Sequence, residues 1–234
     1  MSQTQACKTT VGVLALQGAF AEHQTALQKI PSARKVTACL VRTPDDLEKC
    51  DALIIPGGES TTIALLAKLA GLLEPLRQFS KTKPIWGTCA GAILLAQVVE
   101  NTKKGGQDLL GGMSVTVARN GWGSQVESFE APLIVDGLQN SERPFTGVFI
   151  RAPVILALHP SPDAPPMHVV ARLSVGTVPK SSTASLQLDP NDPRTIVAVR
   201  QGKHLMTTFH PELTKDGRFH EYFVQNCVLP SLSL

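Results

Sequence analysis

Residues 84–99 read PIWGTCAGAILLAQVV, and this stretch decides the fold. Its first three residues, Pro84 to Trp86, predict a very short strand, and the apolar run Ala90–Val99 predicts a buried helix. The two meet in a tight turn flanked by Gly87 and Gly91. A strand that turns directly into a helix is the building unit of a parallel sheet covered by helices. We therefore expect the same unit elsewhere in the chain.

The chain before residue 84 repeats this alternation of strand and helix. The predicted strands are Val11–Leu16, Lys35–Val41 and Ala52–Ile55, and the predicted helices are Ala19–Ile30, Pro44–Lys49, a helix with Ser60 as its N-cap, and Leu72–Phe79. The pattern is typical of a flavodoxin-like α/β fold, an open and mostly parallel sheet with helices on both faces.

Beyond Asn101 the pattern changes, because strands follow one another without long helices between them. We expect strands at Ser114–Ala118, Ser128–Ala131, Val148–Ile150, Thr195–Arg200 and Leu205–Phe209, forming an antiparallel extension, and a final helix at Arg218–Val228. Residues 160–193 are rich in proline, serine and threonine, and we expect much of this region to be a surface insertion. One apolar run interrupts it, Val169–Leu173, whose alternative interpretation is a strand of the sheet.

Length and composition indicate a globular protein of one domain. The 234 residues are 43% hydrophobic and 18% charged, enough for one large buried core over residues 1–234. The net charge of +3 is not concentrated in a basic run, which argues against a nucleic-acid surface. No stretch approaches the roughly eighteen apolar residues of a membrane helix, and the first ten residues lack a secretory signal. Five cysteines without a close pair favour reduced thiols, a cytoplasmic location and no metal site.

Cys89 lies at the centre of the turn between strand and helix, in Gly87-Thr88-Cys89-Ala90-Gly91. This is the sequence context of a nucleophile elbow, with cysteine in place of serine. The glycines remove side-chain clashes around a strained central residue, and the start of a helix favours thiolate over thiol. A small cysteine packed in a tight turn is the alternative interpretation. The flanking glycines and the strand-to-helix context favour a reactive nucleophile.

A thiolate nucleophile requires a base that is oriented by a third group, and His210-Pro211-Glu212 offers both. Proline biases the preceding residue towards extended geometry, so His210 and Glu212 should point to the same side. Glu212 can then orient the imidazole of His210. By contrast, we expect His204 and His220 to be surface residues, because neither has a carboxylate in a comparably rigid arrangement.

A third segment, Pro56-Gly57-Gly58-Glu59-Ser60, directly follows a predicted strand. Loops at the carboxyl ends of neighbouring parallel strands converge on one crevice, so this loop should meet the Cys89 turn. The backbone amides of Gly58 and Ala90 could together form an oxyanion hole.

The order of these motifs along the chain is specific: glycine loop, nucleophile, then histidine with an acid two residues later. An α/β-hydrolase places its acid before the histidine. In this order the motifs resemble those of class I glutamine amidotransferases. Further segments resemble the family of glutaminase subunits of pyridoxal 5′-phosphate synthases, over about Val11–Phe223: VLALQGAF (13–20), PGGESTT (56–62), Arg119-Asn120, SFE (128–130) and TGVFIRAP (146–153).

The resemblance implies that Cys89, His210 and Glu212 are a catalytic triad. It also implies a glutamine site lined by Gly58, Glu59, Ser60, Arg119, Ile150 and Arg151. Arginines are suited to hold the α-carboxylate of free glutamine while its distant amide reacts. One departure concerns Ser124, where the family usually has arginine. It affects one local polar contact.

The implied activity is hydrolysis of L-glutamine to glutamate and ammonia, without a cofactor, and delivery of the ammonia to the synthase subunit in a hetero-oligomeric complex. Two alternatives remain at this point. One is the glutaminase subunit of another biosynthetic amidotransferase, against which the Phe149–Pro153 and Ser128–Glu130 segments argue. The other is a non-catalytic regulatory or scaffold subunit, which would not need Cys89, His210 and Glu212 together.

Overall fold

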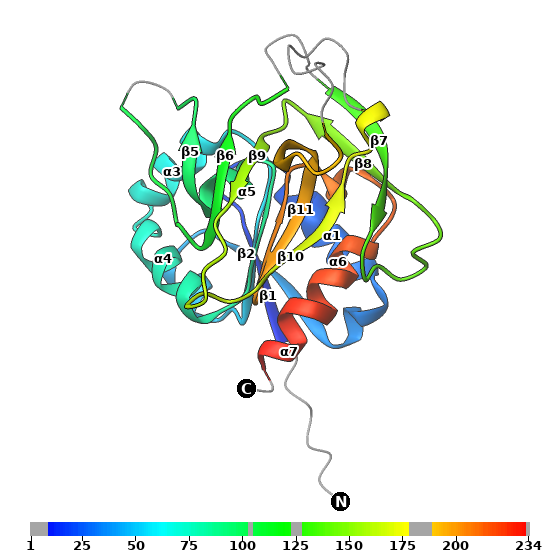
Figure 1. Cartoon of the computed structure of the whole chain (residues 1–234). Coiled ribbons are helices and arrows are strands. Elements are labelled where there is room, and N and C mark those ends of the chain that lie inside the picture. Colours follow the sequence, from blue (N-terminus) through cyan, green and yellow to red (C-terminus); the bar gives the residue numbers. More distant parts are fainter. Residues whose placement is uncertain (1–8, 103–104, 123–127, 178–188, 233–234) are drawn as a thin grey trace, which may run out of the picture.

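The computed structural model describes residues 9–102, 105–122, 128–177 and 189–232, and a nine-stranded sheet lies at the centre of this part of the chain (Figure 1). The strand order is β2-β1-β3-β4-β12-β11-β10-β7-β8. The first five strands in this order are parallel: β2 (Val36–Val41), β1 (Thr9–Leu14), β3 (Ala52–Ile55), β4 (Ile85–Thr88) and β12 (His204–Thr207). The other four are antiparallel: β11 (Ile196–Gln201), β10 (Met167–Arg172), β7 (Ser128–Val135) and β8 (Phe145–Ile150). The predicted parallel sheet with an antiparallel extension is confirmed.

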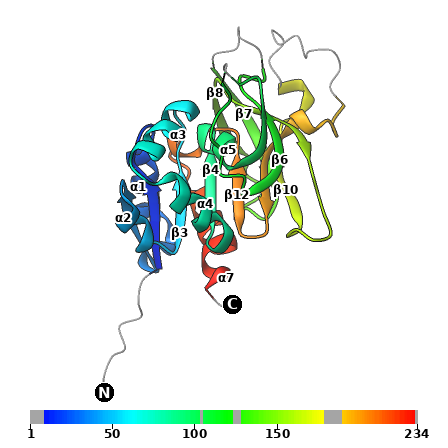
Figure 2. The same ribbon diagram turned by 90° about the vertical axis from the view of Figure 1, so that its left-hand side faces the viewer.

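Helices cover both faces of this sheet, as expected (Figure 2). One face packs on α1 (Phe20–Lys29), on α6 (Arg218–Phe223) with the π-helical turn Val224–Val228, and on α7 (Leu229–Ser231). The other face packs on α2 (Pro44–Glu48), α3 (Ser60–Leu69), α4 (Leu73–Thr82) and α5 (Ala90–Leu95). Short 3₁₀ turns lie at Pro31–Arg34, Val175–Thr177, Pro193–Thr195 and Pro211–Leu213. Within the described residues no helix is long and apolar enough to cross a membrane.

The apolar run after Cys89 is not one helix, which corrects the prediction for Ala90–Val99. Helix α5 ends at Leu95, and Ala96 already has extended geometry with ψ 152°. The following residues form β5 (Ala96–Glu100), which pairs with β6 (Met113–Ala118), and β6 pairs with β9 (Val154–Leu158) in a second sheet. The β-branched Val98 and Val99 suit a strand, and the ladder to β6 supplies their backbone partners.

The strand register brings four loops to one edge of the central sheet. Val13 of β1 pairs with Ile54 of β3, and Ile55 pairs with Gly87 of β4. On the other side of β4, Thr88 pairs with Thr207 of β12. Because these strands are parallel, the chain leaves each of them at the same edge. The glycine loop, Cys89 and His210 therefore follow neighbouring strand ends.

Within residues 160–193, the alternative interpretation of the apolar run Val169–Leu173 as a strand of the sheet is the correct one. Residues 167–172 form β10, an inner strand between β11 and β7. Val170, Ala171 and Leu173 are buried in the core. This strand therefore belongs to the core and is not part of a surface insertion. The remainder of the region includes residues 178–188, which lie outside the described residues.

We predict that Val170→Asp lowers the free energy of unfolding by roughly 3 kcal/mol or more, because it buries a carboxylate without a partner. The matched control is His168→Gln on the same strand, whose side chain is 46% exposed, and which should stay within about 0.5 kcal/mol of the parent. Urea unfolding followed by circular dichroism measures both. Equal stabilities of the two variants would show that β10 contributes nothing to the core.

Candidate active site

Cys89 occupies a strained turn that close packing imposes. Its backbone has φ 47° and ψ −102°, and its N–H donates to the Thr207 carbonyl at 2.9 Å. A β-carbon on Gly87 would lie 2.8 Å from Ala92 N, and one on Gly91 would lie 2.8 Å from the carbonyl carbon of Ile55. Only glycine allows this approach of α5 to β3 and β4. The predicted elbow is therefore present, with Cys89 only 6% exposed.

His210 and Glu212 lie together at the end of β12. The His210 N–H donates to the Val148 carbonyl at 2.8 Å, which fixes its backbone against β8. Its Nδ1 lies 2.7 Å from Oε1 of Glu212, and both side chains are buried. A β-carbon on Gly57 would lie 2.8 Å from His210 Nδ1 and 3.3 Å from Cys89 Cβ. The bare Gly57 backbone thus packs against both His210 and Cys89.

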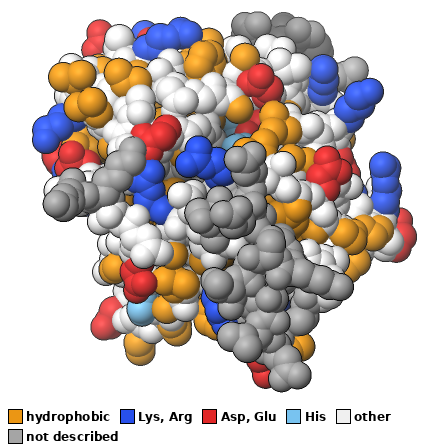
Figure 3. All heavy atoms as spheres, turned by 90° about the horizontal axis from the view of Figure 1, so that it is seen from above, with side chains coloured by type: hydrophobic (Ala, Val, Ile, Leu, Met, Phe, Trp, Pro, Cys, Tyr) orange, Lys and Arg blue, Asp and Glu red, His pale blue; other side chains and the backbone are white. Residues whose placement is uncertain are grey.

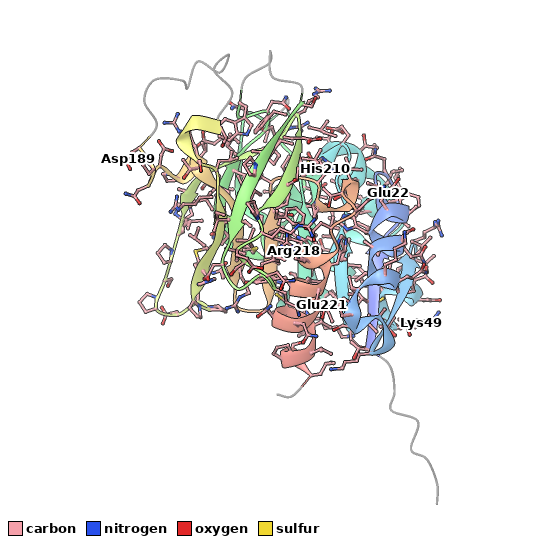
Figure 4. All side chains as sticks on the ribbon, turned by 90° about the vertical axis from the view of Figure 1, so that its right-hand side faces the viewer. Glu22, Lys49, Asp189, His210, Arg218 and Glu221 are labelled. Atoms are coloured by element: carbon pink, nitrogen blue, oxygen red, sulfur yellow. The ribbon has the colours of Figure 1, made fainter. Side chains whose placement is uncertain are left out.

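The charge on His210 is set by its two partners. Burial lowers the pKa of His210, but hydrogen bonds to Cys89 and Glu212, and the negative charges of both, raise it further, to about 10. His210 is therefore expected to be an imidazolium at neutral pH. Figure 4 shows His210 near the upper end of α1, on which Glu22 is labelled.

The glycine loop contacts the turn that follows β1. The Gly57 carbonyl accepts a hydrogen bond from Ala19 N at 3.2 Å, and Gln17 Oε1 accepts one from Glu59 N at 2.8 Å. Since C=O and N–H point in opposite directions in a trans peptide, the Gly58 N–H faces away from the Ala19 backbone. Ala90 is the first residue of α5, where N–H groups have no intrahelical acceptor. The predicted oxyanion hole of Gly58 and Ala90 remains a prediction.

Glu59 connects the glycine loop to α3 and to Arg119. Glu59 itself is the N-cap of α3, which corrects the prediction for Ser60: its Oε2 accepts from Thr62 N at 2.8 Å. Its Oε1 lies 2.7 Å from Arg119 Nη2. Burial raises the pKa of Glu59, but hydrogen bonds from Thr61, Thr62 and Arg119 lower it further, to about 2. Arg119 and Glu59 thus form a charged pair beside the loop.

Gln107 belongs to this group, although nothing in its Gly-Gly-Gln context indicated a role. Its Oε1 accepts from Ser60 Oγ at 3.0 Å and from Arg119 Nη1 at 3.2 Å. Only the fold reveals it, because it lies far along the chain from the glycine loop. In the view from above, Lys or Arg, Asp or Glu, and His side chains lie close together near the middle of the upper face of the molecule (Figure 3).

The Ile150–Arg151 segment approaches the nucleophile from β8. The Ile150 carbonyl oxygen lies 3.9 Å from Cys89 Sγ. Arg151 is exposed and has φ 45°, a strained backbone for a residue with a side chain. Ser124, the departure from the usual family pattern, lies outside the described residues. No group of three or more His, Cys, Asp or Glu side chains in the described ranges is arranged to hold a metal ion.

Comparison with known proteins decides the family. The model of the SNO glutamine amidotransferase family matches residues 13–229. The chain belongs to this family.

Individual family members are similar to the chain over most of its length. A protein of Arabidopsis thaliana named "Probable pyridoxal 5'-phosphate synthase subunit PDX2" is 47% identical, over 92% of this chain and 85% of that protein. A pyridoxal 5′-phosphate synthase subunit of Chloroflexus aurantiacus is 46% identical, over 92% of this chain and 99% of that protein. A crystal structure of a glutamine amidotransferase superposes with a TM-score of 0.72 at 42% identity, and the match covers 93% of this chain and 98% of that one. A GMP synthase subunit structure from Thermoplasma acidophilum, at 16% identity and TM-score 0.56, shares the fold.

Two histidines expected at the surface of this family member are buried instead. His204 Nδ1 accepts from Ile85 N at 3.1 Å, and burial lowers the pKa of His204 to about 4. His220 is fully buried, which lowers its pKa to about 3. A third, His23, was not singled out from the sequence: burial, and then the repulsion of His220 and His210, hold its pKa well below the usual 6.5. In place of water, His204 has the Ile85 backbone as its hydrogen-bond partner, and His23 and His220 have each other.

The buried neutral histidines predict a loss of stability in mild acid. Below the ordinary pKa of 6.5, His23, His204 and His220 are protonated in the unfolded chain but stay neutral in the folded state. The free energy of unfolding therefore decreases as the pH is lowered. His210 has the opposite sign: its contribution is complete below 6.5 and is lost only as pH rises towards 10. Glu59 stabilises the folded state above its ordinary pKa of 4.5, and this contribution is lost only as the pH falls from about 4.5 towards 2.

The measurement is urea unfolding at about pH 7 and about pH 5, on the parent and on His220→Phe. The variant should lose less free energy of unfolding over this interval, because it has one fewer histidine that protonates only when unfolded. Identical losses in the two proteins would contradict the buried neutral state of His220.

Proposed function

We propose that residues 1–234 act as one glutaminase domain, which hydrolyses L-glutamine at Cys89 and supplies ammonia to a pyridoxal 5′-phosphate synthase subunit. One observation carries the chemistry: a cysteine in a strained elbow and a histidine that is hydrogen-bonded to a buried carboxylate both pack on the bare Gly57 backbone. This arrangement supplies a nucleophile, a base and an orienting group.

In the first half-reaction the Cys89 thiolate attacks the side-chain amide carbon of glutamine. The His210 imidazolium gives its proton to the departing nitrogen, so ammonia leaves and a γ-glutamyl thioester remains. In the second half-reaction the neutral His210 takes a proton from water, which attacks the thioester and releases glutamate and the thiolate. The Gly58 and Ala90 amides stabilise the oxyanion in both steps.

Glutamine recognition requires groups for its α-carboxylate and α-ammonium. We assign these to Gly58, Glu59, Ser60, Arg119, Ile150 and Arg151. The Glu59–Arg119 pair, with Oε1 and Nη2 2.7 Å apart, presents both charge signs beside the glycine loop. Such a pair matches the opposite charges of a free amino acid. Ser60 and Gln107 keep Arg119 in place through the shared Gln107 oxygen.

The partner is proposed from the relatives, which are named as subunits of pyridoxal 5′-phosphate synthase at 46–47% identity. The subunit of another amidotransferase is a weaker alternative, since the GMP synthase structure shares only the fold at 16% identity. A purely structural subunit is also disfavoured. The φ of 47° at Cys89 and the burial of Glu212 both cost free energy that a scaffold would not need.

We predict that Cys89→Ala abolishes ammonia release, by roughly a thousandfold or more, while glutamine still binds. Glu212→Gln should lose less activity than His210→Asn, since it removes the orienting charge and keeps the base. Coupled ammonia detection measures the rates, and calorimetry measures glutamine binding. Turnover of Cys89→Ala near the parent rate, or the opposite order for the other two variants, would refute these roles.

We also predict that the isolated chain is a weak glutaminase whose rate rises severalfold or more with the cognate synthase subunit. Among the described residues, one backbone hydrogen bond of 3.2 Å, from Ala19 N, holds the Gly57 carbonyl. This peptide can therefore reorient at low cost, and synthase binding would select one orientation. A β-carbon on Gly58 would collide with the Gln17 amide group.

Gly58→Val should therefore depress the stimulated rate far more than it weakens complex formation measured by calorimetry. Gly176→Ala is the control, because a β-carbon there meets nothing within 4 Å. Equal parent rates with and without synthase, at saturating glutamine, would exclude this coupling.

A further inference from the structure

Only one oxygen of the buried Glu212 carboxylate is accounted for by the triad. Oε1 accepts from His210 Nδ1 at 2.7 Å. Oε2 is buried and has no hydrogen bond of normal geometry, but His23 Nε2 lies 3.4 Å from it. An unpartnered carboxylate oxygen without solvent is costly, so a donor at this distance requires an explanation.

His23 and His220 form a chain of imidazoles behind the carboxylate. His23 Nδ1 lies 2.9 Å from His220 Nε2, and His23 Nε2 lies 3.2 Å from Thr88 Oγ1. Both rings are fully buried and contact the Trp86 ring, with centroids 5.6 Å and 5.0 Å away. His23 comes from α1, His220 from α6 and Thr88 from β4. This row of imidazoles thus runs from α6, through α1, to the triad.

Hydrogen-bond accounting selects one arrangement of protons along this chain. If His220 Nε2–H donates to His23 Nδ1, then His23 carries its proton on Nε2 and directs it at Thr88 and Glu212. In this arrangement His220 Nδ1 is left as a bare acceptor, and Thr88 Oγ1 accepts from His23 Nε2 instead of donating to it. The reverse arrangement points a lone pair of His23 at the carboxylate. It would also leave His220 Nδ1–H as a buried donor without a partner, which costs more.

Both rings remain neutral in this environment. Burial lowers the pKa of His220 to about 3, and burial with the repulsion of His220 and His210 lowers that of His23. A neutral donor orients the carboxylate without adding a second positive charge. The negative charge of Glu212 therefore remains available to the His210 imidazolium.

We propose that His23 is a positioning residue of the reaction: its Nε2–H, kept in that tautomer by His220, fixes Glu212, which in turn orients His210. The proposal rests on the glutaminase function proposed above. It extends the machinery by two residues, His23 and His220, that act only through the carboxylate.

The kinetic test compares two substitutions of His23 in the complex with the synthase subunit. His23→Leu removes the donor and should lower kcat for glutamine by roughly tenfold to a hundredfold with KM unchanged. His23→Gln places an amide N–H near the former Nε2 and should recover a substantial part of that loss. The control is His204→Leu, another buried histidine, at the opposite end of β12, whose kcat should stay near the parent value.

The spectroscopic test needs no turnover. Imidazole ¹⁵N spectra of the full chain should show His23 as the neutral Nε2–H tautomer, and His220→Phe should shift it towards a mixture of tautomers. This readout remains interpretable if His23→Leu fails to fold, and it distinguishes the two proposals. A chain without glutaminase activity in the complex, but with the Nε2–H tautomer of His23, would refute the proposed function and leave the arrangement of His23 and Glu212 intact.

Two results would overturn the positioning role. One is an Nδ1–H tautomer of His23 in the parent protein, because its Nε2 lone pair would then face Glu212. The other is a folded His23→Leu variant with kcat equal to that of the His204→Leu control. A fall in kcat that His23→Gln does not recover at all would also contradict it, since a lost hydrogen-bond donor should be replaceable.

Discussion

The close approach of α5 to β3 and β4 is the constraint on which the site depends. Gly87 and Gly91 have no room for a β-carbon, and the chain between them must turn within a few residues. Cys89 therefore takes φ 47°, a conformation that the surrounding backbone enforces through the hydrogen bond from its N–H to Thr207. The same parallel register that causes this crowding brings the end of β12, and with it His210, next to the cysteine.

Electrostatics explain why the site is built on a buried carboxylate. His210 can remain charged in a largely buried position because its interactions with Cys89 and Glu212 raise its pKa to about 10. Glu212 in turn cannot reach solvent, so its second oxygen depends on the protein for a donor. The neutral histidines behind it supply polarity without competing charge. Cys89 is thus coupled to the packing of α1 and α6, which lie on the other side of the carboxylate.

The sequence predicted the parallel half of the fold and the grouping of Cys89, His210 and Glu212, because local spacing and strand order determine both. It failed where distant partners decide. Helix α5 stops at Leu95 because β6 offers a ladder, and the choice between strand and insertion for Val169–Leu173 is decided by the neighbouring strands β11 and β7. His204 and His220 are buried because Ile85 N and His23 replace water as their partners. Gln107 joins the site only through tertiary contacts with Ser60 and Arg119.

Trp86 links the fold to the chemistry more directly than its place in a short strand suggests. Its Nε1–H donates to Thr207 Oγ1 at 3.1 Å, and its ring contacts both His23 and His220. The ring therefore excludes water from the imidazole chain, and this dryness keeps both histidines neutral. Water admitted here would offer partners to Glu212 and to His220 Nδ1, and so weaken the preference for one tautomer. In the proposed reaction, a core side chain of this kind acts by fixing where protons reside.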